Sequence, residues 1–202
     1  MCAAKIVNKM RKVAVLASGN GSNAENLYHF FSQRGLASLA VILSNHSDAG
    51  VMARAERLKI PAYAFTTKEM HEGTKPIALL KELGIELIVL AGYMCYITPP
   101  YLEAFPDRIV NIHPALLPKF GGKGMYGHHV HEAVLAAGEK ESGITIHLVD
   151  EHYDHGKILR QAVCPVLPED TPDTLAERIH ALEYAHYPEA IEEYLLRLPA
   201  ES

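Results

Sequence analysis

A chain of 202 residues, 49% of them hydrophobic and 21% charged, has the balance of a globular protein with one sizeable core. Its net charge of -5 excludes a broad basic face, so we expect no nucleic-acid partner. No stretch approaches the roughly 20 apolar residues of a membrane span, so we expect no membrane association. Cys2, Cys95 and Cys164 are too far apart for a metal motif and are typical of a reduced, cytoplasmic chain.

The first half of the chain alternates short apolar runs with helical patterns. Strands are predicted within residues 12–18, 39–45, 60–65, 85–92 and 108–113, and helices within 22–31, 50–59 and about 75–83. The runs are apolar throughout, as in parallel strands that are buried on both faces. Their alternation with helices predicts right-handed crossovers, and therefore a doubly wound, Rossmann-like α/β sheet.

The last third has a different pattern. Residues 143–150 and 156–166 are two strands joined by a connection too short for a parallel crossover. We therefore predict an antiparallel hairpin at one edge of the mostly parallel sheet. A long C-terminal helix follows over residues 171–198, with Thr171 as N-cap, Pro172 in the first turn and a kink or break at Pro188. No repeat or linker appears, so residues 1–202 are interpreted as a single domain.

The loop "SGNGSNAEN" (Ser18 to Asn26) lies between the first strand and the first helix. Small residues and a helix N-terminus at this place favour a bound phosphate, with Gly21, Ser22 and Asn23 as its candidate partners. The alternative is a tight turn that needs glycine only for its backbone angles.

A dinucleotide site is a second alternative, because Gly19, Gly21 and Ala24 fit G-x-G-x-x-A. That motif expects an acid at the end of the second strand, which here ends in Ser44 and Asn45, and Asp48 comes too late. The pattern favours a single phosphate.

Asn111 and His113 are two residues apart at the C-terminal end of the fifth predicted strand, so they share a face. An amide can donate to a carbonyl oxygen that gains charge, and an imidazole can exchange a proton near neutral pH. This pair predicts a site for attack on a carbonyl carbon. The alternative is a capping amide and a half-buried histidine bonded to a loop.

A carboxylate beside His113 would orient it and raise its basicity. Asp150, Glu151 and Asp154, in the hairpin connection, are the candidates, and spacing does not choose among them. The glycine-rich segment 119–127 is interpreted as a lid or a solvated loop.

The histidines raise the question of a metal site. They are His128, His129, His131, His147, His152 and His155. No HExxH motif or cysteine cluster accompanies them, so we expect no metal.

Five segments together carry a resemblance to a known family. They are "SGNGSN", "LAGYM", "NIHPALLP", "HLVDEHYDHGKIL" and "EYAHYP", in this order. From Lys12 to Tyr194 the chain resembles the phosphoribosylglycinamide formyltransferases, the folate-dependent transformylases of purine synthesis. The resemblance implies a formyltransferase fold and transfer of a formyl group from 10-formyltetrahydrofolate to the amine of 5-phosphoribosylglycinamide, without a metal.

The resemblance also implies roles for individual residues. The N-terminal part would bind the phosphate of the ribonucleotide, through Gly21, Ser22 and Asn23, and His180 and Glu183 in the long C-terminal helix would also bind the ribonucleotide. The C-terminal part would carry catalysis and folate, and the folate residues would be Met94, Cys95, Tyr96, Ile97, Asn111, Asp150, Glu151, His152, Tyr153 and Asp154. Asn111, His113 and Asp154 match the catalytic trio: the first two would stabilise the oxyanion, and Asp154 would sustain the charge of His113 and assist proton transfer.

Some positions depart from the family pattern. Many members carry Arg at Cys95, and others have Lys or Gln at His180. Lys68 and Lys75 are alternative contacts for the folate glutamate tail. The chain is expected to be a monomer or a homodimer.

Two other kinds of function are alternatives. Formyltetrahydrofolate deformylase and methionyl-tRNA formyltransferase share the transfer core, but each is expected to carry an additional domain, and the net charge disfavours tRNA. A non-catalytic nucleotide-binding module would keep the glycine loop without needing Asn111, His113 and Asp154 together.

Overall fold

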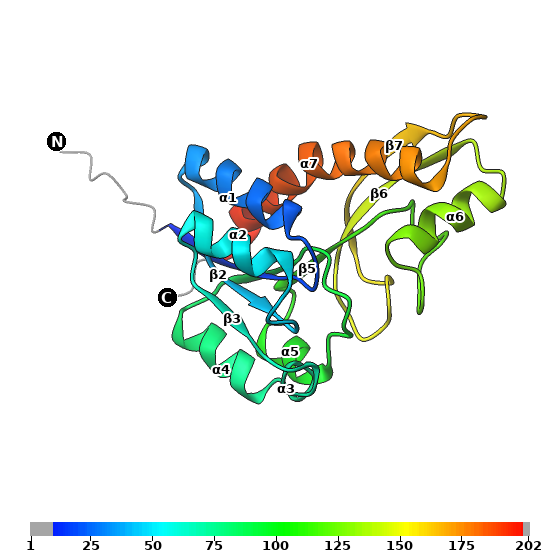
Figure 1. The fold of residues 1–202 in the computed structure, drawn as a ribbon. Coiled ribbons are helices and arrows are strands. Elements are labelled where there is room, and N and C mark those ends of the chain that lie inside the picture. The colour runs from blue at the N-terminus through cyan, green and yellow to red at the C-terminus, as the bar shows by residue number, and fades with distance from the viewer. Residues whose placement is uncertain (1–9, 200–202) are drawn as a thin grey trace.

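A seven-stranded sheet in the order β3-β2-β1-β4-β5-β6-β7 forms the centre of the protein (Figure 1). The computed structural model describes residues 10–199, and Cys2 lies outside them. The strands are β1 (Arg11–Leu16), β2 (Ala37–Ser44), β3 (Ala62–Ala64), β4 (Leu87–Leu90), β5 (Ile109–His113), β6 (Glu141–Leu148) and β7 (Ile158–Pro165). Strands β1 to β5 pair in parallel, whereas β6 is antiparallel to both β5 and β7. The predicted doubly wound sheet and antiparallel edge are confirmed.

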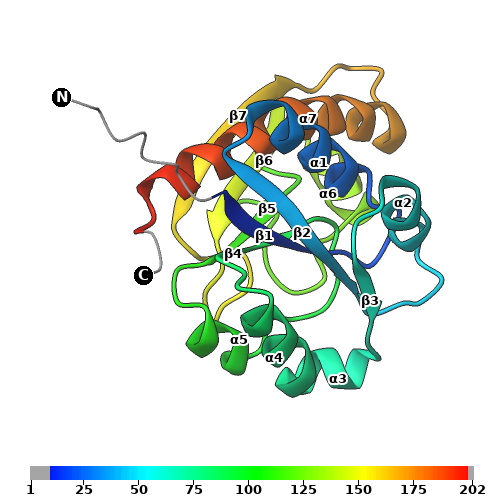
Figure 2. The ribbon, with the colours of Figure 1, turned by 90° about the vertical axis from the view of Figure 1, so that its left-hand side faces the viewer.

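Helices cover both faces of the sheet (Figure 2). The helices are α1 (Ser22–Arg34), α2 (Gly50–Leu58), α3 (Thr67–Glu72), α4 (Thr74–Glu82), α5 (Pro99–Ala104), α6 (His128–Ala136) and α7 (Pro172–Arg197). One core layer joins the sheet to α1, α2 and α7, and the other joins it to α3, α4 and α5. The six-residue helices α3 and α5 were not predicted, because so few residues do not establish a helical period.

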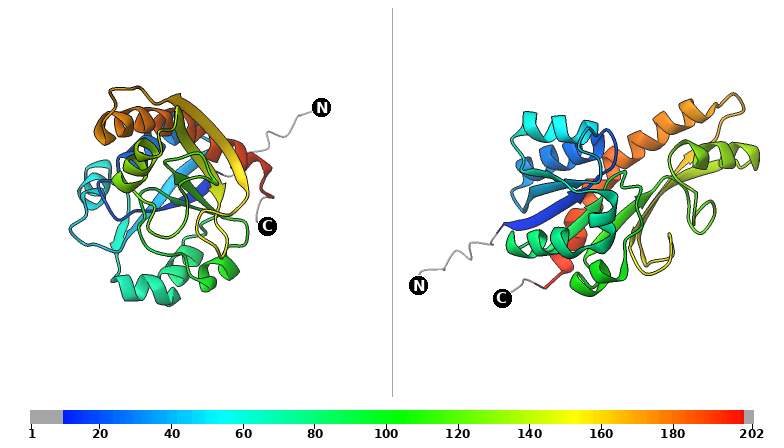
Figure 3. Two further views of the ribbon diagram at one scale, coloured as in Figure 1. Left: turned by 90° about the vertical axis from the view of Figure 1, so that its right-hand side faces the viewer. Right: turned by 60° about the horizontal axis from the view of Figure 1, so that its bottom comes forward.

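One end of the molecule is built from α6, the first half of α7 and the β6–β7 ribbon (Figure 3). It lies away from both ends of the chain in the right-hand view. Among residues 10–199, no helix combines the length and the apolar character needed to cross a membrane.

Helix α7 begins as predicted and is anchored at both ends. Thr171 accepts a hydrogen bond from the N–H of Thr174 in a capping box, and Pro172 stands in the first turn. At the other end, the Arg11 guanidinium donates to the carbonyls of Leu195 and Leu198 and pairs with Glu86 at 2.9 Å. Arg11 is buried, so it ties the helix end to the start of β1.

Of the kink or break predicted at Pro188, the break does not occur, because α7 continues through it as one helix of 26 residues. A proline leaves the carbonyl four residues earlier without its helical donor. Here that carbonyl belongs to Tyr184, and the Asn26 side chain on α1 donates to it at 2.9 Å. The packing of α1 against α7 therefore supplies the missing hydrogen bond.

Asn26→Ala should lower the free energy of unfolding by about 0.5–1 kcal/mol, because it leaves the Tyr184 carbonyl to water. In a Pro188→Ala background the loss should shrink, since an alanine at this position supplies its own N–H. Urea denaturation of the four proteins in this cycle measures the coupling.

Ser32→Ala is the matched control, since the Ser32 hydroxyl donates only within α1, to the Tyr28 carbonyl. Its effect should be the same with and without the Pro188→Ala substitution. Equal losses for Asn26→Ala in both backgrounds would contradict our account of the unbroken helix.

Candidate active site

A pocket of about 420 Å³ opens at the C-terminal ends of β1, β4 and β5. Open α/β sheets bind their ligands at this edge. The pocket is bounded by the loop after β1, the segment after β4, the tip of β5 and the connection after β6, and residues of α6 and α7 complete its lining.

Strand β6 pairs with β5 so that Asn111 lies opposite His147 and His113 lies opposite Thr145. Cross-strand partners project on the same face, so all four side chains belong to one surface. The Asn111 amide nitrogen lies 3.3 Å from Nε2 of His147. Nδ1 of His147 lies 2.7 Å from the Leu148 carbonyl, which can only accept, so Nδ1 carries a hydrogen, while Nε2 faces both the Asn111 amide and the Asp154 carboxylate.

His113 is held at both ring nitrogens and is only 3% exposed. Nε2 donates to the Phe120 carbonyl at 2.7 Å, and Nδ1 lies 3.5 Å from Oδ2 of Asp154. Two oxygen acceptors favour an imidazolium with both nitrogens protonated. Burial opposes this and prevails over Asp154 and Phe120, so the pKa of His113 lies below its ordinary value.

Asp154 is the acid that the fold brings to His113, as the resemblance implies. Its Oδ2 accepts the Gly122 N–H at 2.9 Å, and its Oδ1 lies 3.7 Å from Nε2 of His147. Burial alone would raise the pKa of Asp154, but His147, His113 and the Gly122 N–H together outweigh it and lower the pKa. The carboxylate is therefore ionised at neutral pH.

Close backbone approach explains the glycine of the "DHG" segment. A Cβ at Gly156 would lie 1.8 Å from the Leu148 carbonyl oxygen, a contact that no side chain can make. Gly156 thus lets the connection fold back against the end of β6, which aims Asp154 at His113.

Thr145 anchors the loop that reaches over His113. Its hydroxyl donates to the Ala115 carbonyl at 2.7 Å and accepts from the Leu117 N–H and the Gln161 amide. Sequence reasoning missed Thr145, and it considered His147 only as a metal ligand. The available signal was the apolar–polar alternation of β6, which places Thr145 and His147 on one face.

The glycine loop forms the opposite end of the pocket. Gly21 has φ 77°, and a Cβ there would meet Val51 at 2.4 Å, so glycine is required. Helix α1 begins at Ser22 with no side-chain cap, which leaves its first N–H groups available to an anion. Asn23 donates to Glu183 at 2.8 Å, and burial raises the pKa of Glu183, against the opposing effects of Asn23 and His180.

The segment after β4 forms one side of the pocket, through Met94, Cys95, Tyr96 and Ile97. The Tyr96 ring lies 5.0 Å from that of Tyr153. Burial raises the pKa of the Cys95 thiol, although a hydrogen bond with Tyr93 opposes this.

Most predicted site residues line this one pocket, including Asp150, His152 and His180. Glu151 does not: its side chain is 77% exposed with the carboxylate 3.9 Å from Nδ1 of His152, and its carbonyl accepts from the Tyr96 hydroxyl at 2.7 Å. Lys68 and Lys75 lie outside the lining and pair with Glu72 and Glu69.

The histidines serve separate purposes. His128 and His129 lie 3.8 and 3.4 Å from Asp173 and Glu132, and His131 is buried against the pocket. Within the described range 10–199, no three His, Cys, Asp or Glu side chains form a group that could hold a metal ion.

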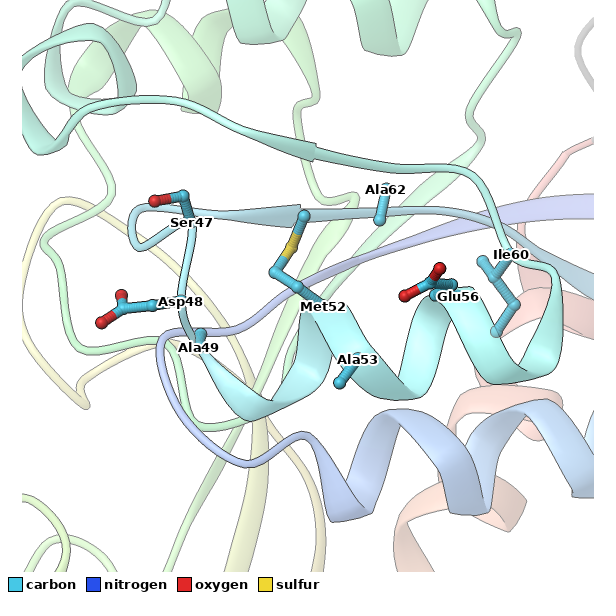
Figure 4. Close-up of a pocket in the computed structure, with 8 residues that line it drawn as sticks. All are labelled: Ser47, Asp48, Ala49, Met52, Ala53, Glu56, Ile60 and Ala62. Carbon is cyan, nitrogen blue, oxygen red and sulfur yellow. The ribbon is translucent and has the colours of Figure 1, made fainter.

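Asp48 does not line the pocket that the glycine loop borders. It lines a separate hollow of about 540 Å³ beside α2 (Figure 4), toward which Met52 and Glu56 project from the helix. Ser44 and Asn45, at the end of β2, are buried, and Asn45 accepts from the Ser18 hydroxyl at 2.7 Å. The carboxylate expected of a dinucleotide site is thus not at the end of β2.

Comparison with known proteins places the chain in a family. Residues 11–191 match the family described as "Formyl transferase". The phosphoribosylglycinamide formyltransferase of Bacillus subtilis (strain 168) is 39% identical over 191 residues, which are 92% of this chain and 95% of that protein. The chloroplastic enzyme of the same name from Arabidopsis thaliana is 40% identical over 91% of this chain, which spans 65% of its length.

A solved structure gives the same relationship in three dimensions. The crystal structure of phosphoribosylglycinamide formyltransferase from Brucella melitensis superposes with a TM-score of 0.85 at 36% identity, over 96% of this chain and 100% of that one. The chain therefore belongs to the formyl transferase family and, within it, to the phosphoribosylglycinamide formyltransferases.

Proposed function

We propose that this chain transfers the formyl group of 10-formyltetrahydrofolate to the amine of 5-phosphoribosylglycinamide, a step of purine biosynthesis. The observation that carries the proposal is the convergence of Asn111, His113 and Asp154 at one end of a pocket whose other end is the uncapped start of α1. A carbonyl-activating group thus faces an anion site within a single cavity.

In the proposed reaction the amine nitrogen attacks the formyl carbon and the carbonyl oxygen becomes an oxyanion. The new C–N bond then replaces the bond to N10 of the folate, and one amine proton ends on N10. Asn111 and protonated His113 donate to the oxyanion. Because Nε2 of His113 is engaged by Phe120, we propose that the formyl oxygen takes the place of the Phe120 carbonyl.

Asp154 is proposed to sustain the charge on His113 and to assist proton transfer. Its carboxylate raises the pKa of His113 against the effect of burial. The bond between Asn111 and His147 supports a positioning role for His147, since it holds the amide at the tip of β5.

The remaining residues are proposed to hold the two substrates. Gly21, Ser22 and Asn23 bind the phosphate, and Glu183 and His180 bind the ribonucleotide. The segments 94–97 and 150–154, together with Asn111, hold the folate. A half-apolar wall with Ile97 and Val149 fits a flat heterocycle.

We keep three broader expectations as proposals: one domain over residues 1–202, action as a monomer or homodimer, and a cytoplasmic location. The Arabidopsis relative carries the name chloroplastic, so compartment differs within this family.

Formyl loss from 10-formyltetrahydrofolate should require the ribonucleotide, and His113→Asn should lower kcat by about 10²–10⁴-fold because it removes the ionisable donor. Absorbance of the folate product measures both. His129→Asn, an exposed histidine outside the pocket, should keep full activity.

Two results would contradict the proposal. Turnover without the ribonucleotide would indicate a deformylase. No turnover with either acceptor, together with binding of a nicotinamide cofactor, would favour a nucleotide-binding module.

Asp154→Asn should lower kcat and move the alkaline limb of the pH–rate profile to lower pH. The carboxylate raises the pKa of His113, so its loss lets His113 give up its proton at a lower pH. Stopped-time assays across the pH range measure the shift, with Asp48→Asn as the matched control. An unchanged alkaline limb would remove Asp154 from the role we give it.

Ser22→Ala should raise the KM for the ribonucleotide about tenfold and leave kcat and the folate KM nearly unchanged, because it removes one hydrogen bond to a charged group. Steady-state kinetics with each substrate varied separate the two constants. If the ribonucleotide KM stays the same, Ser22 does not contact the phosphate.

A further inference from the structure

The pocket has an unusual set of charges for a site that receives a phosphate. Among the described residues, its lining contains no lysine and no arginine. The side chains that can become cationic are His113, His131, His147, His152 and His180, and the acids are Asp150, Asp154 and Glu183. The permanent positive charge that comes close, Arg54, lies behind the glycine loop, where it donates to Asn20, and does not line the pocket.

Among the histidines that line the pocket, His131 is the one to which the proposed function assigns no role. It stands in the first turn of α6, is 3% exposed and lines the pocket. Its Nδ1 is fully buried and has no hydrogen-bond partner. Buried polar nitrogens without partners are rare in folded proteins and call for an explanation.

A second polar atom at the same end of the pocket is also without a partner. Asn23 donates through its amide nitrogen to Glu183, but its Oδ1 is buried and unpaired. Asn23 lies in the first turn of α1, and His131 faces α7 near His180. Two such atoms in one cavity indicate that this end is built for a ligand that forms hydrogen bonds.

We propose that His131 and His180 bind the phosphorylated end of the ribonucleotide and that the pair takes up a proton when it binds. The chain would thus hold the phosphate with titratable bases and the start of α1 in place of a fixed cation. This inference rests on the proposed function, whose ribonucleotide supplies the phosphate.

The charged and titratable groups around His131 determine whether it is protonated before the phosphate binds. His128 faces it from α6, His180 from α7 and His113 from β5. Burial, and then these three bases, lower the pKa of His131 to about 4, so it is neutral in the free protein. His128 lies near Asp173, and Glu183 is bonded to Asn23.

A bound dianion reverses this balance, because opposite charge within a few ångströms favours the protonated imidazole. Raising the pKa of a base on binding means proton uptake, so affinity is greatest at low pH and falls as pH rises. Glu183 is the one nearby carboxyl whose raised pKa could produce the same sign, and it has to be tested separately.

Isothermal titration calorimetry with ribose 5-phosphate tests the proposal. This probe has the phosphate and ribose but no amine, and above about pH 7 its phosphate is mostly dianionic. Titration in two buffers of different ionisation enthalpy gives the number of protons taken up. We expect uptake in the unmodified chain and affinity that weakens about tenfold between about pH 6.5 and about pH 8.5.

Five variants identify the group that takes up the proton. His131→Asn and His180→Asn should each reduce the uptake, and His180→Lys should keep tight binding with less dependence on pH, since its charge is permanent. Glu183→Gln and His113→Asn should leave the uptake in place. His129→Asn, on the same helix but outside the lining, is the matched control and should behave like the unmodified chain.

Binding without proton uptake would overturn the inference, and so would uptake that survives both His131→Asn and His180→Asn or disappears in Glu183→Gln. If the buried His131→Asn variant does not fold, the exposed His180→Asn and His180→Lys pair carries the test. An assay of formyl transfer by the unmodified chain distinguishes failure of this inference from failure of the proposed function. Turnover without proton uptake rejects this inference alone, whereas absence of turnover rejects the proposed function.

Discussion

The antiparallel pairing of β6 with β5 is the constraint on which the arrangement of Asn111, His113 and Asp154 depends. Its register places His147 beside Asn111 and Thr145 beside His113. Thr145 then anchors the loop that carries the Phe120 carbonyl, and the chain beyond β6 turns back to bring Asp154 to His113. A shift of one residue in β6 would turn Thr145 and His147 to the other face of the sheet, away from Asn111 and His113.

Helix α7 organises the part of the pocket around the glycine loop, as β6 organises the part around His113. It runs unbroken from the pocket to the start of β1, where Arg11 anchors its last turn. Along the way Glu183 meets Asn23, and Asn26 supplies the hydrogen bond that Pro188 cannot make. Tyr187 is buried between them, and its hydroxyl lies 2.8 Å from the Leu90 carbonyl at the end of β4. One helix thus joins the phosphate loop to the strand tips.

Burial and charge oppose each other throughout the pocket. Burial lowers the pKa of His113 and raises that of Glu183, in each case favouring the neutral form. Asp154 is kept ionised only because His147, His113 and a backbone N–H outweigh its desolvation. In such surroundings a substrate that brings its own negative charge changes the protonation of its neighbours more than it would in water.

Most of the fold could be predicted from sequence, because it depends on local patterns. The apolar runs around β1, β2, β4 and β5 are continuous, and the short connection between β6 and β7 permits only a hairpin. The predicted break at Pro188 failed for a non-local reason, since the compensating donor comes from α1. Helices α3 and α5 escaped prediction because six residues carry too little periodicity.

The features of the site also divide into those that local sequence predicts and those that depend on tertiary packing. The sequence by itself determined that Asn111 and His113 share a face and that Gly21 opens a helix suited to an anion, because both follow from spacing within a few residues. Residue spacing did not choose among three acids as the partner of His113, and the family resemblance selected Asp154. Only the tertiary structure decided that His147 supports Asn111 from 36 residues away and that His131 is buried without a partner. Strand register and helix packing bring these groups together, and neither leaves a local pattern in the chain.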